Sequence, residues 1–135
     1  MPANGPTVAE AMRPRVIGCT LRTPVMEVAR RLHEEGARRM VVASAGSDLI
    51  AGTVGELDLL RAVIEGHTEG MASDVMRLEA PATVGAGESL AAAVRRMREE
   101  SIDFFVVVGG SPERPVGTLS HAELAAFAAR RRAAG

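Results

Sequence analysis

Residues 25–59 read VMEVARRLHEEGARRMVVASAGSDLIAGTVGELDL, and residues 90–124 read LAAAVRRMREESIDFFVVVGGSPERPVGTLSHAEL. The two stretches align without a gap at a shift of 65 residues, from position 25 to position 90. Ahead of each stretch lies a lead-in that ends in Met12 or Met76, where the spacing slips by one residue. The period is too long for a solenoid repeat. The chain therefore consists of two copies of one small supersecondary unit.

The repeat sets the expected domain organisation of the 135-residue chain. This length suits one compact domain, or two half-domains that share a core. We expect an N-terminal arm over residues 1–6, a first repeat over 7–66, a linker over 67–70 and a second repeat over 71–132.

Hydrophobic spacing predicts the order strand, helix, strand, strand, helix in each copy. Val25, Val28, Ala29 and Leu32 form an apolar stripe of helical period, as do Leu90, Ala93, Val94 and Met97. Thr23 is expected to cap the first of these helices, with Pro24 at its first helical position. The expected strands cover residues 16–19, 39–43, 49–54, 82–84, 104–108 and 116–119, and turns are expected at 44–48 and 109–115. The predicted fold class is α/β with mixed sheets, two repeats packing with pseudo-twofold symmetry.

Composition excludes several classes of function. All 16 basic residues are Arg, which excludes Schiff-base lysine chemistry and a phosphate-loop lysine. The single cysteine, Cys19, is expected to be a small buried hydrophobe, and the three histidines lack zinc-ligand spacing. No catalytic motif is present. We therefore expect neither an enzyme nor a metal site.

The sequence also bears on the cellular surroundings of the chain. It carries no signal peptide and no apolar run long enough to span a bilayer. We expect a soluble, cytoplasmic protein that has no membrane partner.

Two arginine clusters have simple structural interpretations. Arg30 and Arg31 precede Glu34 and Glu35 by four residues, which predicts a solvated helix face with weak ion pairs. The run Arg130-Arg131-Arg132 ends the last helix, where cations suit the helix dipole. A nucleic-acid-binding tail is the alternative for this run, and the net charge of −1 argues against it.

The repeated junction between the last strand and the last helix of each copy is the candidate binding site. It reads GTVGELD over 52–58 and GTLSHAE over 117–123. Helix N-termini favour anionic groups, and an acid in the first helical turn can accept hydrogen bonds from ribose hydroxyls. The alternative is that Asp58 and Glu123 only complement the helix dipole.

Taken together, the Met-ending lead-ins, the striped helices and the repeated Gly-x-x-(Ser/Thr)-x-x-Asp junction resemble a tandem pair of cystathionine-β-synthase-type (CBS) domains, also called a Bateman module. The resemblance covers about residues 7–129. It implies two clefts that bind adenosine-containing ligands such as AMP, ATP or S-adenosylmethionine. It also implies a disc-like homodimer and the regulation of an attached or separate protein.

The resemblance assigns site residues, and each copy departs from the family motif. Asp58 is assigned to the ribose hydroxyls, although Gly55 stands where the motif has a hydroxyl residue. The second copy keeps Ser120 near phosphate but has Glu123 in place of Asp. Base contacts are assigned to Thr83 and Val84 for the Asp58 cleft, and to Val16 and Ile17 for the mirrored cleft with Ser120 and Glu123. Arg39, just before a strand, is the expected phosphate partner, with a solvated surface position as the alternative.

These observations lead to one principal hypothesis and one alternative. The principal hypothesis is a stand-alone regulatory module that senses an adenine nucleotide or S-adenosylmethionine and acts on an unidentified effector protein. The alternative is a structural dimerisation or adaptor module whose clefts have degenerated.

Overall fold

The computed structural model describes residues 5–44, 46 and 49–134, and it divides into two compact units. Unit 2 is the continuous stretch Ile17–Pro81, and unit 1 joins the residues before Ile17 to those after Pro81. Each unit contains one three-stranded sheet. The predicted fold class, a mixed α/β architecture built from two repeats, is therefore confirmed.

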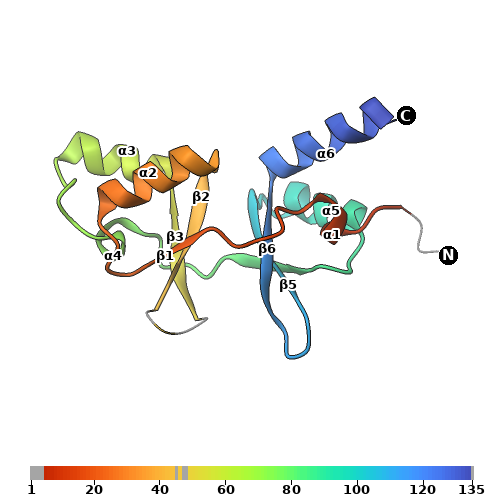
Figure 1. Ribbon diagram of the computed structural model, residues 1–135, viewed down its shortest axis with the longest axis horizontal. Helices are drawn as coiled ribbons and strands as arrows, with labels where there is room; N and C mark the ends of the chain where they lie inside the picture. Colours follow the sequence, from red (N-terminus) through yellow and green to blue (C-terminus); the bar gives the residue numbers. More distant parts are fainter. Residues whose placement is uncertain (1–4, 45, 47–48, 135) are drawn as a thin grey trace. The chain divides into compact units, whose positions relative to one another are not determined.

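Unit 2 holds the sheet β1-β2-β3, in which β2 pairs parallel to β1 and antiparallel to β3. In Figure 1 helices α2 and α3 lie together against this sheet. Its elements are β1 (Gly18–Thr20), α2 (Val25–Glu35), β2 (Arg39–Ala43), β3 (Ile50–Gly55), α3 (Glu56–Glu65) and α4 (Ala72–Val75). The core consists mainly of Val28 and Leu32 of α2, Met40 and Val42 of β2, and Val54 of β3.

Unit 1 repeats this arrangement with the sheet β4-β5-β6. Its elements are α1 (Val8–Ala11), β4 (Ala82–Gly85), α5 (Leu90–Glu99), β5 (Phe104–Gly109), β6 (Arg114–Ser120) and α6 (His121–Ala134). Strand β5 is the central strand, and its first four residues are buried on both faces of the sheet. Phe105 and Val107 face the core, where Val8 of α1 joins them.

The lead-in helices are exchanged between the repeats. Helix α1 precedes the first repeat but packs in unit 1, where the amide of Val8 donates to the carbonyl of Glu88 at 2.9 Å. Helix α4 precedes the second repeat but packs in unit 2, where the amide of Ala72 donates to the carbonyl of Thr23 at 2.8 Å. Each compact unit therefore combines the sheet and striped helix of one repeat with the lead-in of the other.

The boundaries of the elements follow the sequence signals, with a few corrections. Gly36 and Gly66 adopt left-handed conformations (φ 62° and 78°) and end α2 and α3, as glycine at this position favours. The expectation that Thr23 caps α2 is wrong, because Pro24 is the N-cap residue. The Thr23 hydroxyl instead accepts a hydrogen bond from the Thr20 amide at 3.0 Å. Part of the turn expected at 44–48 lies outside the described residues.

Candidate functional site

Asp58 is held at the start of α3 by hydrogen bonds to both of its carboxylate oxygens. It is the third residue of the helix, and its Oδ2 accepts the backbone amide of Gly55 at 2.8 Å. Its Oδ1 accepts Nε–H of Arg77 at 3.3 Å, which also forms an ion pair. The side chain of Asp58 is 12% exposed and that of Arg77 is 46% exposed. Asp58 therefore caps α3 with one carboxylate oxygen and pairs with the half-exposed Arg77 through the other.

A close crossing of two backbone segments puts Arg77 in this position. Thr53 of β3 and Arg77 exchange two backbone hydrogen bonds, of 3.1 and 2.8 Å. The neighbouring residue is Gly52, where a β-carbon would collide with the carbonyl oxygen of Arg77. The first glycine of the repeated junction motif is therefore required because the lead-in of the next repeat crosses the strand there.

Arg39 lies beside Gly55, the residue whose amide Asp58 caps. It is the partner of Gly55 in the β2–β3 register, and its Nη1 donates to Thr53 Oγ1 at 3.3 Å. A β-carbon on Gly55 would lie 3.3 Å from the guanidinium carbon of Arg39. The guanidinium thus packs over the residue where the family motif carries a hydroxyl side chain.

A polar hollow of about 580 Å³ opens beside Asp58 within unit 2. It is formed by α3, the 66–70 segment and α4, and its walls include Arg61, His67 and Asp74. This volume is within the range of small-molecule sites.

The corresponding acid of unit 1 is more fully satisfied by its own unit. Glu123 Oε1 accepts both the backbone amide and the hydroxyl of Ser120, each at 2.7 Å. Its Oε2 lies 3.5 Å from Nε of Arg13, in an ion pair whose side chains are 11% and 21% exposed. Arg13 is placed as Arg77 is, because Arg13 and Thr118 exchange backbone hydrogen bonds beside Gly117.

The structure distributes the predicted site residues over the two units. Asp58, Gly55 and Arg39 come together in unit 2, and Ser120 and Glu123 come together in unit 1. Of the residues assigned to base contacts, Val16, Thr83 and Val84 belong to unit 1 and Ile17 belongs to unit 2.

The sequence-based assignment treated Val16 and Ile17 as the counterparts of Thr83 and Val84, and the sheet register shows a different correspondence. Thr83 pairs with Val106 as Gly18 pairs with Val41, so Gly18 and Cys19 are the counterparts of Thr83 and Val84. The side chains of Ile17 and Val84 are buried in the cores of their units. Any ligand contact by these two residues would therefore be made by the backbone.

Arg13 and Arg77 were missed by the sequence reasoning. Their signal is visible in the sequence, since each directly follows the methionine that ends a lead-in, Met12 or Met76. The pattern indicates a repeated arginine, but only the backbone crossing shows which acid the arginine meets.

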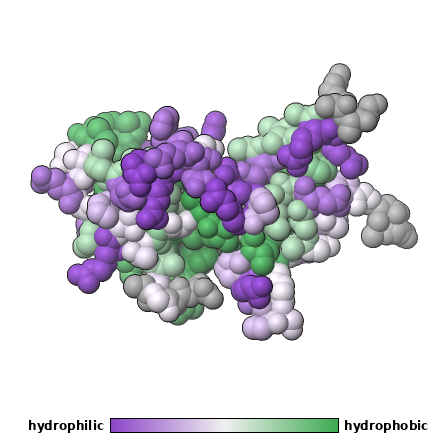
Figure 2. Space-filling model, in the orientation of Figure 1, coloured by the Kyte–Doolittle hydropathy of each residue, from purple (hydrophilic) through white to green (hydrophobic). Residues whose placement is uncertain are grey.

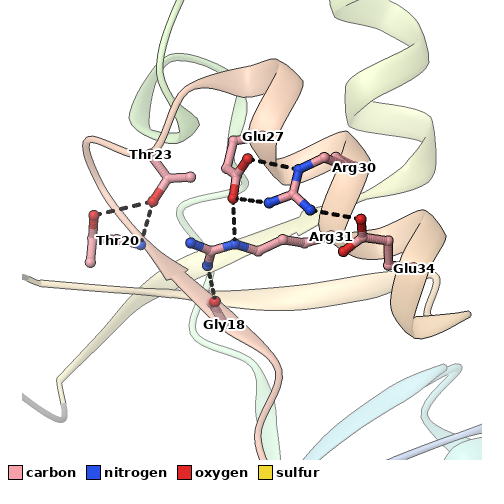
Figure 3. A network of polar contacts seen from close by, with 7 residues as sticks. All are labelled: Gly18, Thr20, Thr23, Glu27, Arg30, Arg31 and Glu34. Carbon is pink, nitrogen blue, oxygen red and sulfur yellow. Dashed lines mark hydrogen bonds and ion pairs between the residues drawn. The ribbon is translucent and has the colours of Figure 1, made fainter.

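A second repeated arginine supports the first strand of each sheet. Figure 3 shows Arg31 of α2 between Glu27 and the carbonyl oxygen of Gly18, to which its Nη1 donates at 3.0 Å. Arg96 of α5 makes the equivalent bond to the carbonyl of Thr83 at 3.1 Å. Arg30 pairs with Glu34 as predicted, at 2.7 Å, but the expectation of a merely solvated role for Arg31 is wrong.

Cys19 is buried in the core of unit 2, at 5% exposure, as predicted. Burial raises the pKa of its thiol, and the nearby charge of Arg31 and a hydrogen bond with Thr23 only partly oppose this rise. A thiol with a raised pKa is a poor nucleophile at neutral pH. Cys19 is therefore a packing residue.

Neither a metal-binding cluster nor a membrane-spanning helix is found in the part of the chain that the structure describes. No group of three or more His, Cys, Asp or Glu side chains within residues 5–44, 46 and 49–134 is arranged to hold a metal ion. Within the same ranges no helix combines the length and the apolar character that a membrane crossing requires.

Comparison with known proteins decides the family. The model of the CBS domain matches the chain twice, over residues 8–65 and 72–130. The chain belongs to the CBS domain family. No curated protein sequence matches it significantly.

Solved CBS structures share the fold of this CBS domain pair. A CBS domain protein from Pyrobaculum aerophilum, solved in complex with AMP, is 26% identical, with a TM-score of 0.74 and coverage of 88% of this chain and 90% of that chain. The CBS domain pair of protein MJ0100, in complex with 5′-methylthioadenosine and S-adenosyl-L-methionine, is 15% identical (TM-score 0.78; coverage 95% and 99%). The CBS domain of a bacterial CNNM/CorC family Mg²⁺ transporter, in complex with ATP, is 17% identical (TM-score 0.73; coverage 90% and 85%).

Proposed function

We propose that this CBS pair is a regulatory module that senses an adenine nucleotide and has no catalytic activity of its own. The observation that carries the proposal is the group around Asp58: Arg77 pairs with its Oδ1, and Arg39 packs over Gly55, whose amide is accepted by its Oδ2. A carboxylate accepts hydrogen bonds from ribose hydroxyls, and guanidinium groups bind phosphate. The AMP complex of the relative from Pyrobaculum aerophilum supports this ligand class.

The mechanism that we propose is a shift between conformations of the module. A ligand changes such an equilibrium only by binding one conformation better than another. Ribose hydroxyls that bind Asp58 would compete with Arg77 for Oδ1 and free the side chain of this arginine. An effector protein would then respond to the state in which Arg77 is freed.

Thermal unfolding with a ligand panel tests the proposal. AMP, ADP, ATP, NAD and S-adenosylmethionine are each added to the protein. A ligand that binds only the folded state and is present at about 100 times its own dissociation constant adds about 2.7 kcal/mol to the free energy of unfolding. We expect an adenine nucleotide to raise the midpoint, and Asp58→Ala to abolish the rise. Glu10→Ala is the matched control, because Glu10 also accepts its N-cap amide, that of Thr7, at 2.9 Å, but does so in α1. If no ligand raises the midpoint, the sensor function is wrong.

The second candidate function is a structural dimerisation or adaptor module without a ligand. The observation that favours it is Glu123, whose two oxygens are already bound by Ser120 and Arg13. A complete absence of ligand effects on the midpoint, together with stable self-association, would support it.

We further propose that the module forms a homodimer through α3. Four large apolar side chains of this helix are more than half exposed: Leu57, Leu60, Val63 and Ile64. In Figure 2 apolar surface gathers over α3, at the upper left. Such a stripe would be buried if it packed against the same stripe of a second copy across a twofold axis. The matching positions of α6, such as Ala125 and Ala129, carry only alanine, so the stripe is specific to unit 2.

A further inference from the structure

Each sheet has one edge strand, β1 or β4, whose outer side is paired with no other strand among the described residues. The opposite edges, on β3 and β6, are crossed by the lead-ins at Arg77 and Arg13. An uncovered edge strand presents backbone N–H and C=O groups to which a strand of another chain can add. The outer sides of β1 and β4 are therefore the places where these sheets could be extended.

The parallel register of β1 and β2 shows which backbone groups point outward. The amide of Val41 donates to the carbonyl of Ile17, so Gly18, the register partner of Val41, directs its own amide and carbonyl away from β2. Successive residues of a strand alternate, so Thr20 is oriented in the same way as Gly18. An added strand would have to bond to the outward groups of these two residues.

Side chains and a tight turn already occupy outward groups of β1 (Figure 3). The carbonyl of Gly18 accepts Nη1–H of Arg31 at 3.0 Å, and the amide of Thr20 donates to the Thr23 hydroxyl at 3.0 Å. The carbonyl of Thr20 accepts the amide of Thr23 at 3.1 Å. A strand that approached β1 would have to displace these bonds, and the guanidinium that it displaced would lose an acceptor.

Unit 1 closes its outer edge in the same way with partly different residues. The carbonyl of Thr83 accepts Nη1–H of Arg96 at 3.1 Å. The amide of Gly85 donates to the carboxylate of Glu88, which stands where the first repeat has Thr23. A carboxylate in one unit and a hydroxyl in the other thus occupy the same outward amide.

The two arginines are also held in place by different partners. In unit 2 the arginine pairs with Glu27, and Ala92 stands at the matching position of unit 1. Nε of Arg96 instead lies 3.6 Å from Glu100, and its guanidinium carbon lies 4.9 Å from the centre of the Phe105 ring. The bond to the edge carbonyl therefore recurs although its supports differ, so it is not a by-product of one local network.

The sequence of the first edge explains why closure matters most there. Residues 16–21 read VIGCTL, a stretch with β-branched side chains, no charge and no proline, and Arg15 and Arg22 flank it. Uncharged segments of this kind add readily to other strands when they are exposed at an edge. The matching stretch of unit 1, residues 81–86, reads PATVGA and begins with a proline, which opposes strand pairing by itself.

We propose that Arg31 and Arg96 close the outer edges of the two sheets to strand addition, so that neither a further copy of this chain nor a strand of a partner protein joins the sheets there. The proposal is independent of nucleotide sensing. It confines association to surfaces other than these edges, such as the exposed stripe of α3.

A peptide that copies the first edge, residues 15–22 with Cys19→Ser, tests the proposal on the full folded chain. Binding is followed by the amide NMR signals of Gly18 and Thr20. Arg31→Met keeps an aliphatic side chain but removes the bond to β1, and it should bind the peptide at least about tenfold more tightly than the wild type does. Adding Thr23→Val should strengthen the binding further, because the amide of Thr20 is then also open.

Arg30→Met is the matched control. It removes the same charge from the neighbouring residue of α2, but the hydrogen bonds of Arg30 go to Glu27 and Glu34, so its affinity for the peptide should equal that of the wild type. Equal affinity of the wild type and Arg31→Met, or no binding by Arg31→Met with Thr23→Val, would overturn the proposal.

Unit 1 provides a second test that does not depend on the folding of the Arg31 variants. In Arg96→Met the amide signals of Thr83 and Gly85 should respond to the same peptide, whereas in the control Arg95→Met they should not. A response in both variants, or in neither, would show that Arg96 is not what closes β4.

Discussion

Gly52 of β3 lies directly beneath the carbonyl oxygen of Arg77, and there is no room for a β-carbon between them. The same relationship recurs in unit 1 between Gly117 and the carbonyl of Arg13. In both units this close approach brings the arginine to the acid that begins the last helix.

Gly52→Ala and Gly117→Ala should therefore each destabilise the fold, although alanine usually favours the folded state at an unstrained position. The added methyl group must push the lead-in off the strand and break its two backbone hydrogen bonds, at a cost of about 2 to 4 kcal/mol. Urea denaturation measures this loss. Gly87→Ala is the control, because a β-carbon there meets no heavy atom within 4 Å; it should change the unfolding free energy by less than about 0.5 kcal/mol. Equal effects at Gly52 and Gly87 would contradict the close-approach explanation.

Arg31→Ala should cost more stability than Arg30→Ala. Both arginines pair with Glu27, but Arg31 also donates to the carbonyl of Gly18 in the edge strand β1. We expect about 1 kcal/mol for the loss of Arg31 and a smaller loss of stability for Arg30, whose own side chain is solvent-exposed. Chemical denaturation of the two variants provides the measurement. Hydrogen exchange at the amide of Val41, which donates to Ile17 beside this strand, should also accelerate only in Arg31→Ala.

The stability contributed by Glu27 should depend on pH. Hydrogen bonds from Arg30 and Arg31 lower the pKa of this carboxyl below its ordinary value of 4.5. A group with a lowered pKa in the folded state stabilises the fold above its unfolded-state pKa and loses this effect as the pH falls through the folded-state pKa. The wild type should therefore exceed Glu27→Gln in urea midpoint at neutral pH, and the difference should shrink below about pH 4. A difference that is constant over this range would contradict the ion-pair assignment.

Cys19 should react slowly with a thiol reagent while the chain is folded. The thiol is buried and its pKa is raised by that burial, so both access and the thiolate fraction are reduced. At pH 8 we expect modification at least about 100-fold slower than in the guanidinium-unfolded chain. Reaction at comparable rates in both states would show that β1 opens readily.

Ile64→Glu should convert the proposed dimer to a monomer, because it places a charge at the most exposed residue of the apolar stripe of α3. Light scattering coupled to size-exclusion chromatography reports the mass directly. Ala129→Glu, at the matching position of α6, is the control and should leave the mass unchanged. Loss of the dimer in the control alone would place the interface elsewhere.

Much of the fold could be predicted from the sequence because the signals lie close together in the chain. The 3.6-residue stripe around Val28 and the glycine at Gly36 define α2 from neighbouring residues, and β2 covers exactly the residues expected. The exchange of α1 and α4 could not be predicted in this way. The sequence of a short lead-in does not indicate on which of two similar sheets it packs. That choice depends on the backbone path near Gly52 and Gly117, which only the structure shows.

The candidate site likewise has one part that the sequence predicts and another part that only the structure shows. The repeated junction identified Asp58 and Glu123 because the acid and the glycine recur at fixed spacing. The relation between Arg39 and Gly55 depends on the register of two strands, and the relation between Arg77 and Asp58 depends on the crossing of segments 19 residues apart. Neither relation follows from local spacing, although both arginines are visible in the sequence.

The exchanged lead-ins also fix the order in which the chain can complete its units during synthesis. Unit 2 is continuous, so all of its strands and helices are available to fold once Pro81 has left the ribosome. Helix α1 must wait longer, because the helices that it packs against, α5 and α6, are translated only from residues 90 and 121 onward. Until then the apolar side chains of Val8 and Ala11 lack the core that will bury them, and a translational pause between the two sheets would prolong that exposure.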